Sequence, residues 1–130
     1  MNQEKIKKIL VVDDESSITD LVYSILTEKG YEVTTAKDGR EGLKVFESVK
    51  PDLVITDIVM PDMEGIEFMR SLVKMRKGLP VIVMSGNVLG TKFLETARIF
   101  GAQATLRKPF AIQELLEVIA AVEKKNNHLA

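Results

Sequence analysis

The amino-acid sequence predicts one α/β domain in which five parallel strands alternate with five helices. Two observations lead to this prediction. Short apolar and β-branched runs recur along the chain, and helix-length segments separate them. Continuous apolar runs are typical of strands that are buried on both faces of a parallel sheet. Strands and helices that alternate in this way indicate right-handed crossovers, which place helices on both faces of the sheet.

The five strands are predicted, in chain order, at residues 9–12, 33–36, 53–56, 81–84 and 104–107. The segment 33–36 is less apolar than the first strand, and we expect it in the same sheet. Pro51 and Asp52 interrupt the chain before the third strand, and Gly78 and Pro80 do so before the fourth. Such residues are typical of turns between regular elements.

The five helices are predicted at residues 17–29, 40–48, 66–75, 90–100 and 111–125. In the first helix an apolar stripe recurs at helical spacing through Ile18, Leu21, Val22, Ile25 and Leu26. Ser17 and Asp20 fit a capping box at its start, and Gly30 is a typical stop. The helix at 90–100 has a weaker apolar stripe than the others.

Composition excludes several classes of function. The chain has 19 acidic and 18 basic residues, so no overall field favours nucleic acid or an anionic membrane. It has no cysteine, which excludes disulfides, thiolate catalysis and zinc–thiolate sites. The first residues are polar, and no apolar stretch has the length of a membrane span. We therefore expect a cytoplasmic domain over residues 8–125, with a polar lead-in at 1–7 and a frayed tail at 126–130.

Four of the predicted strands end on residues whose chemistry is complementary. These residues are Asp13, Asp14, Glu15, Asp57, Ser85 and Lys108. In an open parallel α/β sheet the ligand site lies outside the carboxyl ends of the strands. The sequence therefore predicts a crevice that holds carboxylates, a hydroxyl and an ammonium group. That combination suits a divalent cation together with a phosphoryl group.

The acidic residues have two interpretations. They could be solvated charges at the start of a helix, where anions are favoured. Asp57 at the end of a central strand favours the other interpretation, because two carboxylates about 4 Å apart repel by roughly 4 kcal/mol at an effective dielectric constant near 20. A cation or a raised pKa relieves that repulsion, and Mg²⁺ suits a site with few carboxylates and several waters. Asp57 is then the best-placed nucleophile for an aspartyl-phosphate.

Lys108 and Ser85 also have a structural and a functional interpretation. Lys108 could be a surface lysine, but Pro109 and Phe110 follow it and indicate a fixed backbone. If the Lys108–Pro109 bond is cis, the lysine is aimed back over the crevice. Its ammonium group would then contact a phosphate oxygen as a point charge. Ser85 precedes Gly86 and could be only a turn residue, or its hydroxyl could donate to the same phosphoryl group.

The motifs resemble the receiver domain of two-component response regulators, in particular single-domain regulators of the chemotaxis type. The matching segments lie between Lys8 and Lys124 and are residues 11–15, 56–65, 84–86 and 108–110. The resemblance implies a flavodoxin-like fold whose sheet has the strand order 2-1-3-4-5. It also implies that Asp57 is the phosphoacceptor, that Mg²⁺ binds Asp13, Asp14, Asp57 and the backbone carbonyl of Val59, and that Ser85 and Lys108 contact the phosphoryl group.

One position departs from the family pattern. Receivers commonly carry Tyr or Phe three residues before the lysine, and its ring turns inward on phosphorylation, but this chain has Thr105 there. We therefore expect Asp57 to be phosphorylated as in other receivers, but without a signal carried by the movement of an aromatic ring at the switch position Thr105. Val59 and Asn87 are predicted at the pocket mouth, where both could flank an attacking water. Asn87 could orient that water through its amide, but Val59 offers no hydrogen bond. We therefore expect water positioning to limit hydrolysis and the phosphoryl group to be fairly long-lived.

The function predicted from the sequence is a phosphorylation-dependent switch and not an enzyme with a diffusible substrate. A partner histidine kinase or histidine phosphotransfer protein would phosphorylate Asp57 with Mg²⁺ as cofactor. The surface formed by residues 90–125 would then bind a downstream protein, and we expect no direct binding of nucleic acid or membrane. The alternative is a small phosphatase or phosphotransferase with an aspartate nucleophile. Such enzymes usually have a second aspartate two residues after the first, where this chain has Val59.

Overall fold

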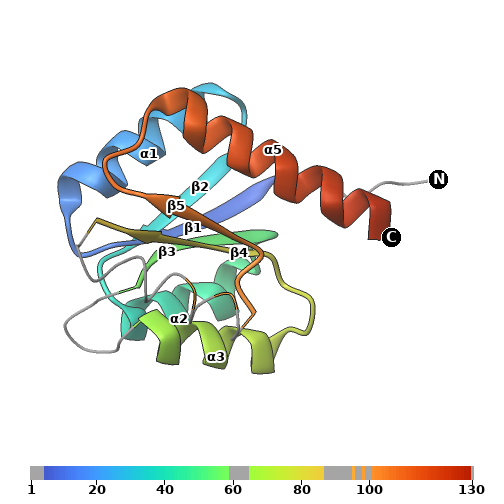
Figure 1. The fold of residues 1–130 in the computed structure, drawn as a ribbon. Coiled ribbons are helices and arrows are strands. Elements are labelled where there is room, and N and C mark those ends of the chain that lie inside the picture. Colours follow the sequence, from blue (N-terminus) through green and yellow to red (C-terminus); the bar gives the residue numbers. More distant parts are fainter. Residues whose placement is uncertain (1–4, 59–64, 87–94, 96–97, 99–100, 130) are drawn as a thin grey trace.

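The computed structural model describes residues 5–58, 65–86, 95, 98 and 101–129. Its centre is a five-stranded sheet in the order β2-β1-β3-β4-β5 (Figure 1). The strands are β1 (Lys8–Val12), β2 (Glu32–Ala36), β3 (Leu53–Asp57), β4 (Val81–Ser85) and β5 (Ala104–Arg107). All four neighbouring pairs are parallel. The predicted sheet and its strand order are confirmed.

The register of the strands brings their carboxyl ends to one edge of the sheet. Val12 lies opposite Thr56, and Asp57 lies opposite Met84. Every residue of β3 and β4 is buried, as expected for central strands covered on both faces. The residues at the ends of β1, β3, β4 and β5 therefore meet at the same edge, where the sequence predicted the crevice.

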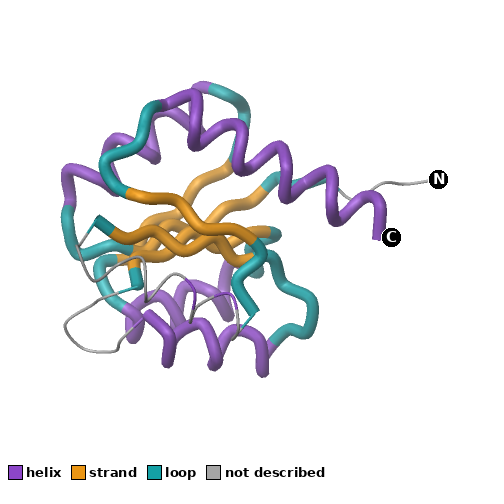
Figure 2. Tube along the Cα trace, in the orientation of Figure 1, coloured by secondary structure: helices purple, strands orange, loops and turns teal. Residues whose placement is uncertain are grey.

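Helices cover both faces of this sheet. Figures 1 and 2 show α1 (Ser16–Glu28) and α5 (Ile112–Leu129) on one face, and α2 (Gly39–Val49) and α3 (Gly65–Met75) on the other. These are the four helices in the described part of the chain, and α5 extends beyond its predicted end at residue 125. The predicted helix at 90–100 lies outside the described residues, apart from Glu95 and Arg98, each of which is helical. Over the described residues, no helix is both long and apolar enough for a membrane span.

The start of α1 differs from the predicted capping box. The N-cap residue is Glu15, and its side chain makes no capping hydrogen bond, so the prediction of Ser17 as the cap is wrong. Instead, the backbone N–H of Glu15 donates to Oδ1 of Asp13 at 2.9 Å, which turns the chain into the helix earlier. Leu21 is 45% exposed because it lies at the edge of the apolar stripe, whose centre is nearer Val22.

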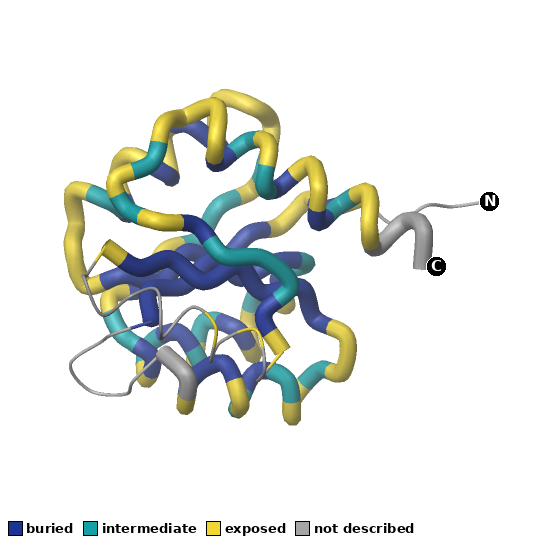
Figure 3. Tube along the Cα trace, in the orientation of Figure 1, coloured by how far each residue is buried: buried dark blue, intermediate teal, exposed yellow. Residues whose placement is uncertain are grey.

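Two apolar cores lie on the two faces of the sheet. One lies between the sheet and α2 and α3, and the other lies between the sheet and α1 and α5. Figure 3 shows the central strands as buried and the outer faces of the helices as exposed. Fully burying one large aliphatic or aromatic side chain contributes about 1.5–3 kcal/mol. The two cores therefore stabilise the fold, so that the polar residues at the carboxyl ends of the strands are not needed for its stability.

Candidate functional site

The end of β1 supplies two carboxylates with different exposure. Asp13 is 1% exposed, and its backbone N–H continues the sheet pattern by donating to the carbonyl of Ala36 at 3.1 Å. Its Oδ1 accepts the N–H of Glu15, so one oxygen fixes the local turn and Oδ2 faces the site. Asp14 is exposed. One carboxylate of the pair is thus fixed and buried, and the other can reach a ligand from the solvent side.

Asp57 is the last residue of β3 and is 8% exposed. One carboxylate oxygen from each of Asp13, Asp14 and Asp57 lies within 4.8 Å of the other two. The structure therefore brings together the three aspartates that the sequence placed at neighbouring strand ends. These oxygens form a group that could hold one cation. Mg²⁺ suits such a group, because it takes oxygen ligands and usually binds one or two carboxylates together with waters.

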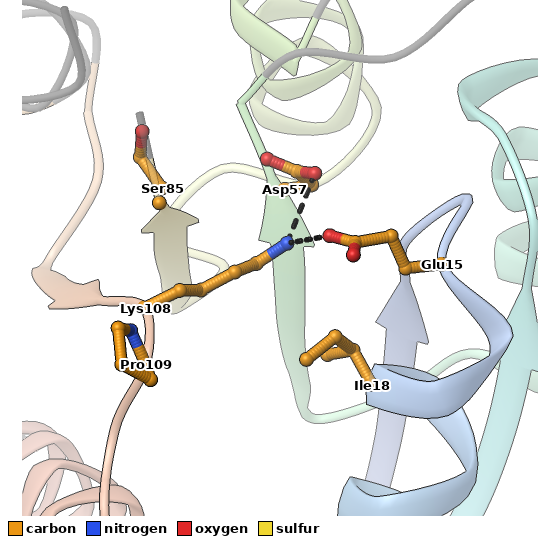
Figure 4. Close-up of a pocket in the computed structure, with 7 residues that line it drawn as sticks. Glu15, Ile18, Asp57, Ser85, Lys108 and Pro109 are labelled. Atoms are coloured by element: carbon orange, nitrogen blue, oxygen red, sulfur yellow. Dashed lines mark hydrogen bonds and ion pairs between the residues drawn. The ribbon is translucent and has the colours of Figure 1, made fainter. Parts of the chain in front are cut away.

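Lys108 extends from the end of β5 across the site toward these carboxylates (Figure 4). Its Nζ lies 2.7 Å from Oδ2 of Asp13, 3.1 Å from Oε1 of Glu15 and 3.2 Å from Oδ2 of Asp57. The Lys108–Pro109 bond is cis, and the lysine points over the crevice as predicted for that isomer. A Cβ atom at Gly86 would lie 3.0 Å from Cβ of Lys108, so glycine leaves room for the lysine stem.

A cavity of about 520 Å³ opens above this group of residues. It is lined by Glu15, Ile18, Asp57, Ser85, Gly86, Lys108 and Pro109. Ser85 ends β4, is 3% exposed and is one of the residues that line the same cavity (Figure 4). The lining of the cavity thus combines an ammonium group, two carboxylates, a serine and the apolar residues Ile18 and Pro109. Such a cavity can accept a small anionic group that reacts with one of these carboxylates.

The electrostatics of the site are dominated by burial. Desolvation raises the pKa of Asp13 from 3.8 to about 6, assisted by the nearby charge of Asp57, although the hydrogen bonds from Lys108 and from the N–H of Glu15 oppose the rise. Burial alone would lower the pKa of Lys108, but its hydrogen bond and charge interaction with Asp13, together with Asp57 and Glu15, raise it overall. Lys108 is therefore a permanent cation at neutral pH, and the ionised form of Asp13 is the one that burial disfavours.

The donor set fits a divalent cation that prefers oxygen ligands. Three aspartate oxygens converge, one of them is buried at an energetic cost when ionised, and an added positive charge would relieve that cost. The ammonium of Lys108 contacts two of the three aspartates. A bound cation would take over part of that contact and leave the ammonium available for another anion.

The other predicted residues do not all lie in this group. Val59 and Asn87 lie outside the described residues, so the pocket mouth that they were predicted to form is not described. Thr105 lies in the middle of β5, opposite Val83, and is partly buried. Glu15, whose carboxylate contacts Lys108, was predicted only as one of the acids at the strand end, with no role of its own. An acidic residue at a helix N-cap, where Ser, Thr, Asp or Asn is usual, was the signal available for it.

The sequence and the architecture match a known family. A family model described as the response regulator receiver domain matches residues 9–120. The chain belongs to this receiver domain family. Receiver domains are signalling modules of two-component systems and not enzymes in the ordinary sense, so the alternative of a small phosphatase is not favoured.

Individual relatives agree with this assignment of the receiver domain. The chain is 36% identical over 126 residues to the alkaline phosphatase synthesis transcriptional regulatory protein PhoP of Bacillus subtilis, which aligns 92% of this chain with 50% of PhoP. It is 33% identical over 119 residues to the chemotaxis protein CheY of Thermotoga maritima, at 91% and 98% coverage. The chain thus spans about half the length of PhoP and nearly all of this CheY.

The solved structures give the same result for the fold. A response regulator receiver domain protein from Clostridium thermocellum superimposes on this receiver domain with a TM-score of 0.87 and 34% identity. The match covers 96% of this chain and 100% of that one. A CheY-like receiver domain protein from Methanospirillum hungatei has a TM-score of 0.85 and 35% identity, and the match covers 96% of this chain and 99% of that one. The fold is therefore that of a receiver domain along almost the whole chain.

Proposed function

We propose that this receiver domain is a switch that accepts a phosphoryl group on Asp57 in a Mg²⁺-dependent reaction. The observation that supports this proposal is the contact of the Lys108 ammonium with Asp57 beside the three clustered aspartates. Asp57 lines a cavity and has a cationic partner at 3.2 Å. A carboxylate in that position can attack phosphorus, and the cation beside it can offset the charge of the phosphoryl group.

The transfer step follows from these positions. One carboxylate oxygen of Asp57 forms a bond to phosphorus, and the bond from phosphorus to the donor nitrogen breaks, with its electron pair going to the donor imidazole. Asp13, Asp14, Asp57 and the carbonyl of Val59 would hold Mg²⁺, which when bound neutralises charge on the transferring oxygens. Lys108 then contacts a phosphoryl oxygen, and the Ser85 hydroxyl donates to another. These groups position and stabilise charge, which is the main task in phosphoryl transfer.

The donor in this proposal is a histidine kinase or a histidine phosphotransfer protein. The output is a change of the surface formed by residues 90–125, which would bind a downstream protein. This surface includes the segment 90–100, where the fourth helix is predicted, and we place the domain in the cytoplasm. The added charge acts by stabilising one of two arrangements of the loops around the site over the other.

The direct test of this function uses the unmodified protein. Incubation with Mg²⁺ and a small phosphodonor, such as acetyl phosphate, should label the chain up to one phosphoryl group per molecule, as seen by intact-mass spectrometry. The label should not form when the metal is removed with EDTA. Release of inorganic phosphate faster than the measured decay of the label allows would indicate an enzyme instead, and no label with or without metal would contradict the proposal.

A prediction concerns the position usually occupied by an aromatic switch residue. Thr105 lies on β5 and is partly buried, and its small side chain cannot fill and leave a ring-sized pocket. We expect Thr105→Ala to keep the chemical-shift changes that phosphorylation, or beryllium trifluoride as its mimic, causes outside the cavity. The measurement compares two-dimensional NMR spectra of both proteins with and without the mimic. Loss of all shifts beyond the cavity in Thr105→Ala would show that Thr105 itself transmits the signal.

A second prediction concerns how long the phosphoryl group survives. Valine at position 59 offers no hydrogen bond to an attacking water, so we propose that water positioning limits hydrolysis. Val59→Asn should shorten the half-life of the phosphorylated protein several-fold. Val59→Ala is the control and should leave Mg²⁺ affinity nearly unchanged, because the proposed metal contact of this residue is its backbone carbonyl. Equal decay rates for Val59→Asn and the unmodified protein would show that this position does not control the water.

A further inference from the structure

We propose that Glu15 is a positioning residue that holds Lys108 in the unphosphorylated state and must release it when Asp57 is phosphorylated. The inference rests on the proposed function of Asp57 and adds a residue that opposes the switch. Oε1 of Glu15 lies 3.1 Å from Nζ of Lys108, and Glu15 lines the cavity together with Asp57 and Lys108 (Figure 4). Glu15 is thus a contact of Lys108 outside the three aspartates that form the proposed metal cluster.

Glu15 is an unusual residue for its position at the start of α1. Glu15 is the N-cap residue of α1, where a side-chain oxygen usually accepts a backbone N–H of the first helical turn. No such hydrogen bond is present, and the carboxylate points away from the helix toward Lys108 (Figure 4). A helix start that lacks its side-chain cap is less stable than a capped one. Glutamate at this position therefore has a local cost relative to a residue that caps the helix, which is consistent with a role for Glu15 beyond starting the helix.

The partners of Lys108 differ in what phosphorylation does to them. Asp13 and Asp57 are both in the proposed metal cluster, so a bound cation competes with the ammonium for them. Glu15 remains available to Lys108 when those two carboxylates hold a metal. A phosphoryl group on Asp57 then needs the same ammonium, and its own negative charge is repelled by Glu15. Glu15 therefore stabilises the state before phosphorylation relative to the state after it.

The size of the effect follows from exposure. The side chain of Glu15 is 58% exposed, whereas that of Lys108 is 10% exposed, so water screens the interaction on one side. Exposed ion pairs of this kind change an equilibrium by up to about fivefold. The proposed device is thus an adjustment of the switch and not a condition for phosphorylation.

The first experiment measures affinity for beryllium trifluoride in saturating Mg²⁺, by titration monitored with NMR. Glu15→Gln keeps the length of the side chain and removes its charge, and we expect it to bind the mimic about two- to fivefold more tightly than the unmodified protein. Asp20→Asn is the matched control, because Asp20 is an exposed acid on the same helix. We expect its affinity to be unchanged, and an equal gain in both variants would overturn the proposal, since net charge would then explain it.

A second variant separates the contact from the local charge. Glu15→Asp keeps the negative charge but is one methylene shorter, and aspartate can cap the helix instead of contacting Lys108. We expect Glu15→Asp to bind the mimic more tightly, in the same direction as Glu15→Gln. If Glu15→Asp has the affinity of the unmodified protein while Glu15→Gln binds more tightly, the effect is repulsion of the anion, and the holding role is wrong.

A thermal unfolding cycle tests the contact without metal or phosphoryl group. Glu15→Gln should lower the unfolding midpoint more when Lys108 is present than in a Lys108→Met background, because only the first change removes the contact between Glu15 and Lys108. The repulsion between Glu15 and the aspartates is common to both backgrounds, so it cancels in the comparison. Equal shifts in the two backgrounds would contradict the proposal. Failure of the unmodified protein to bind beryllium trifluoride would instead contradict the proposed function, so the two failures are distinguishable.

Discussion

Asp57→Asn should reduce phosphorylation by acetyl phosphate to the level seen without Mg²⁺, while the protein stays folded. The amide has the shape of the carboxylate but lacks the charge and the nucleophilic oxygen that form the bond to phosphorus. Asp57 ends a fully buried strand, so its backbone position is set by the sheet. Lys108 keeps Asp13 and Glu15 as partners in this variant. The measurements are intact mass after incubation with the phosphodonor, and circular dichroism with thermal unfolding for the fold.

The control for this variant is the same substitution at a distant helix start. Asp38 is the N-cap residue of α2, and its side chain accepts the N–H of Glu41 at 2.8 Å, a bond that asparagine can also make. Asp38→Asn should therefore take up label as the unmodified protein does. A full, acid-labile label on Asp57→Asn, mapped to another carboxylate, would show that the nucleophile has been assigned to the wrong residue.

The sheet and the meeting of the strand ends could be predicted from the sequence because both depend on pattern alone. Buried parallel strands read as continuous apolar runs, and their register then places Asp13, Asp57 and Ser85 at one edge. The strand that carries a residue determines where in the fold that residue lies. For this reason the apolar runs and the residues that end them are sufficient to predict that the three aspartates gather.

The pairing within the site could not be predicted in the same way. Which carboxylates the ammonium of Lys108 contacts depends on the path of a long side chain over Gly86, and both isomers of an X–Pro bond are compatible with the sequence. The start of α1 was misplaced because Asp13 accepts the N–H of Glu15, a local hydrogen bond between residues two apart that competes with the capping pattern of Ser17. The contact between Glu15 and Lys108 joins residues that are far apart in the chain, and for that reason it could not be predicted from the local pattern.

The second large effect is expected from the buried carboxylate of Asp13. Its pKa rises from 3.8 to about 6 on folding, chiefly because burial disfavours the ionised form. A group whose pKa is raised by folding stabilises the protein fully below its unfolded pKa, and that contribution is lost as the pH rises through the folded pKa. In the absence of metal, Asp13 should therefore reduce stability as the pH increases from about 4 to about 6. A shift of this size corresponds to about 3 kcal/mol at neutral pH.

Asp13→Asn should remove that dependence, because the amide resembles the neutral acid at every pH. In EDTA at pH 7 we expect the variant to be more stable to urea than the unmodified protein by up to about 3 kcal/mol, and the two should converge near pH 4. Asp14→Asn removes an exposed acid of the same cluster and leaves Asp13 intact, so it should keep the slope between pH 4 and 6. The difference between the two variants isolates the contribution of Asp13.

Magnesium should reverse the order of these proteins. Because a cation binds the ionised carboxylates, Mg²⁺ should raise the unfolding midpoint of the unmodified protein and flatten its pH dependence, as expected for a ligand that binds only the folded state. Asp13→Asn, although more stable without metal, should gain little from Mg²⁺, and Asp14→Asn should gain less than the unmodified protein. Equal stabilisation of all three proteins by Mg²⁺ would mean that the aspartates do not hold the metal. The buried carboxylate of Asp13 would then serve only its ion pair with Lys108, and the free-energy cost of ionising it would not be offset by metal binding.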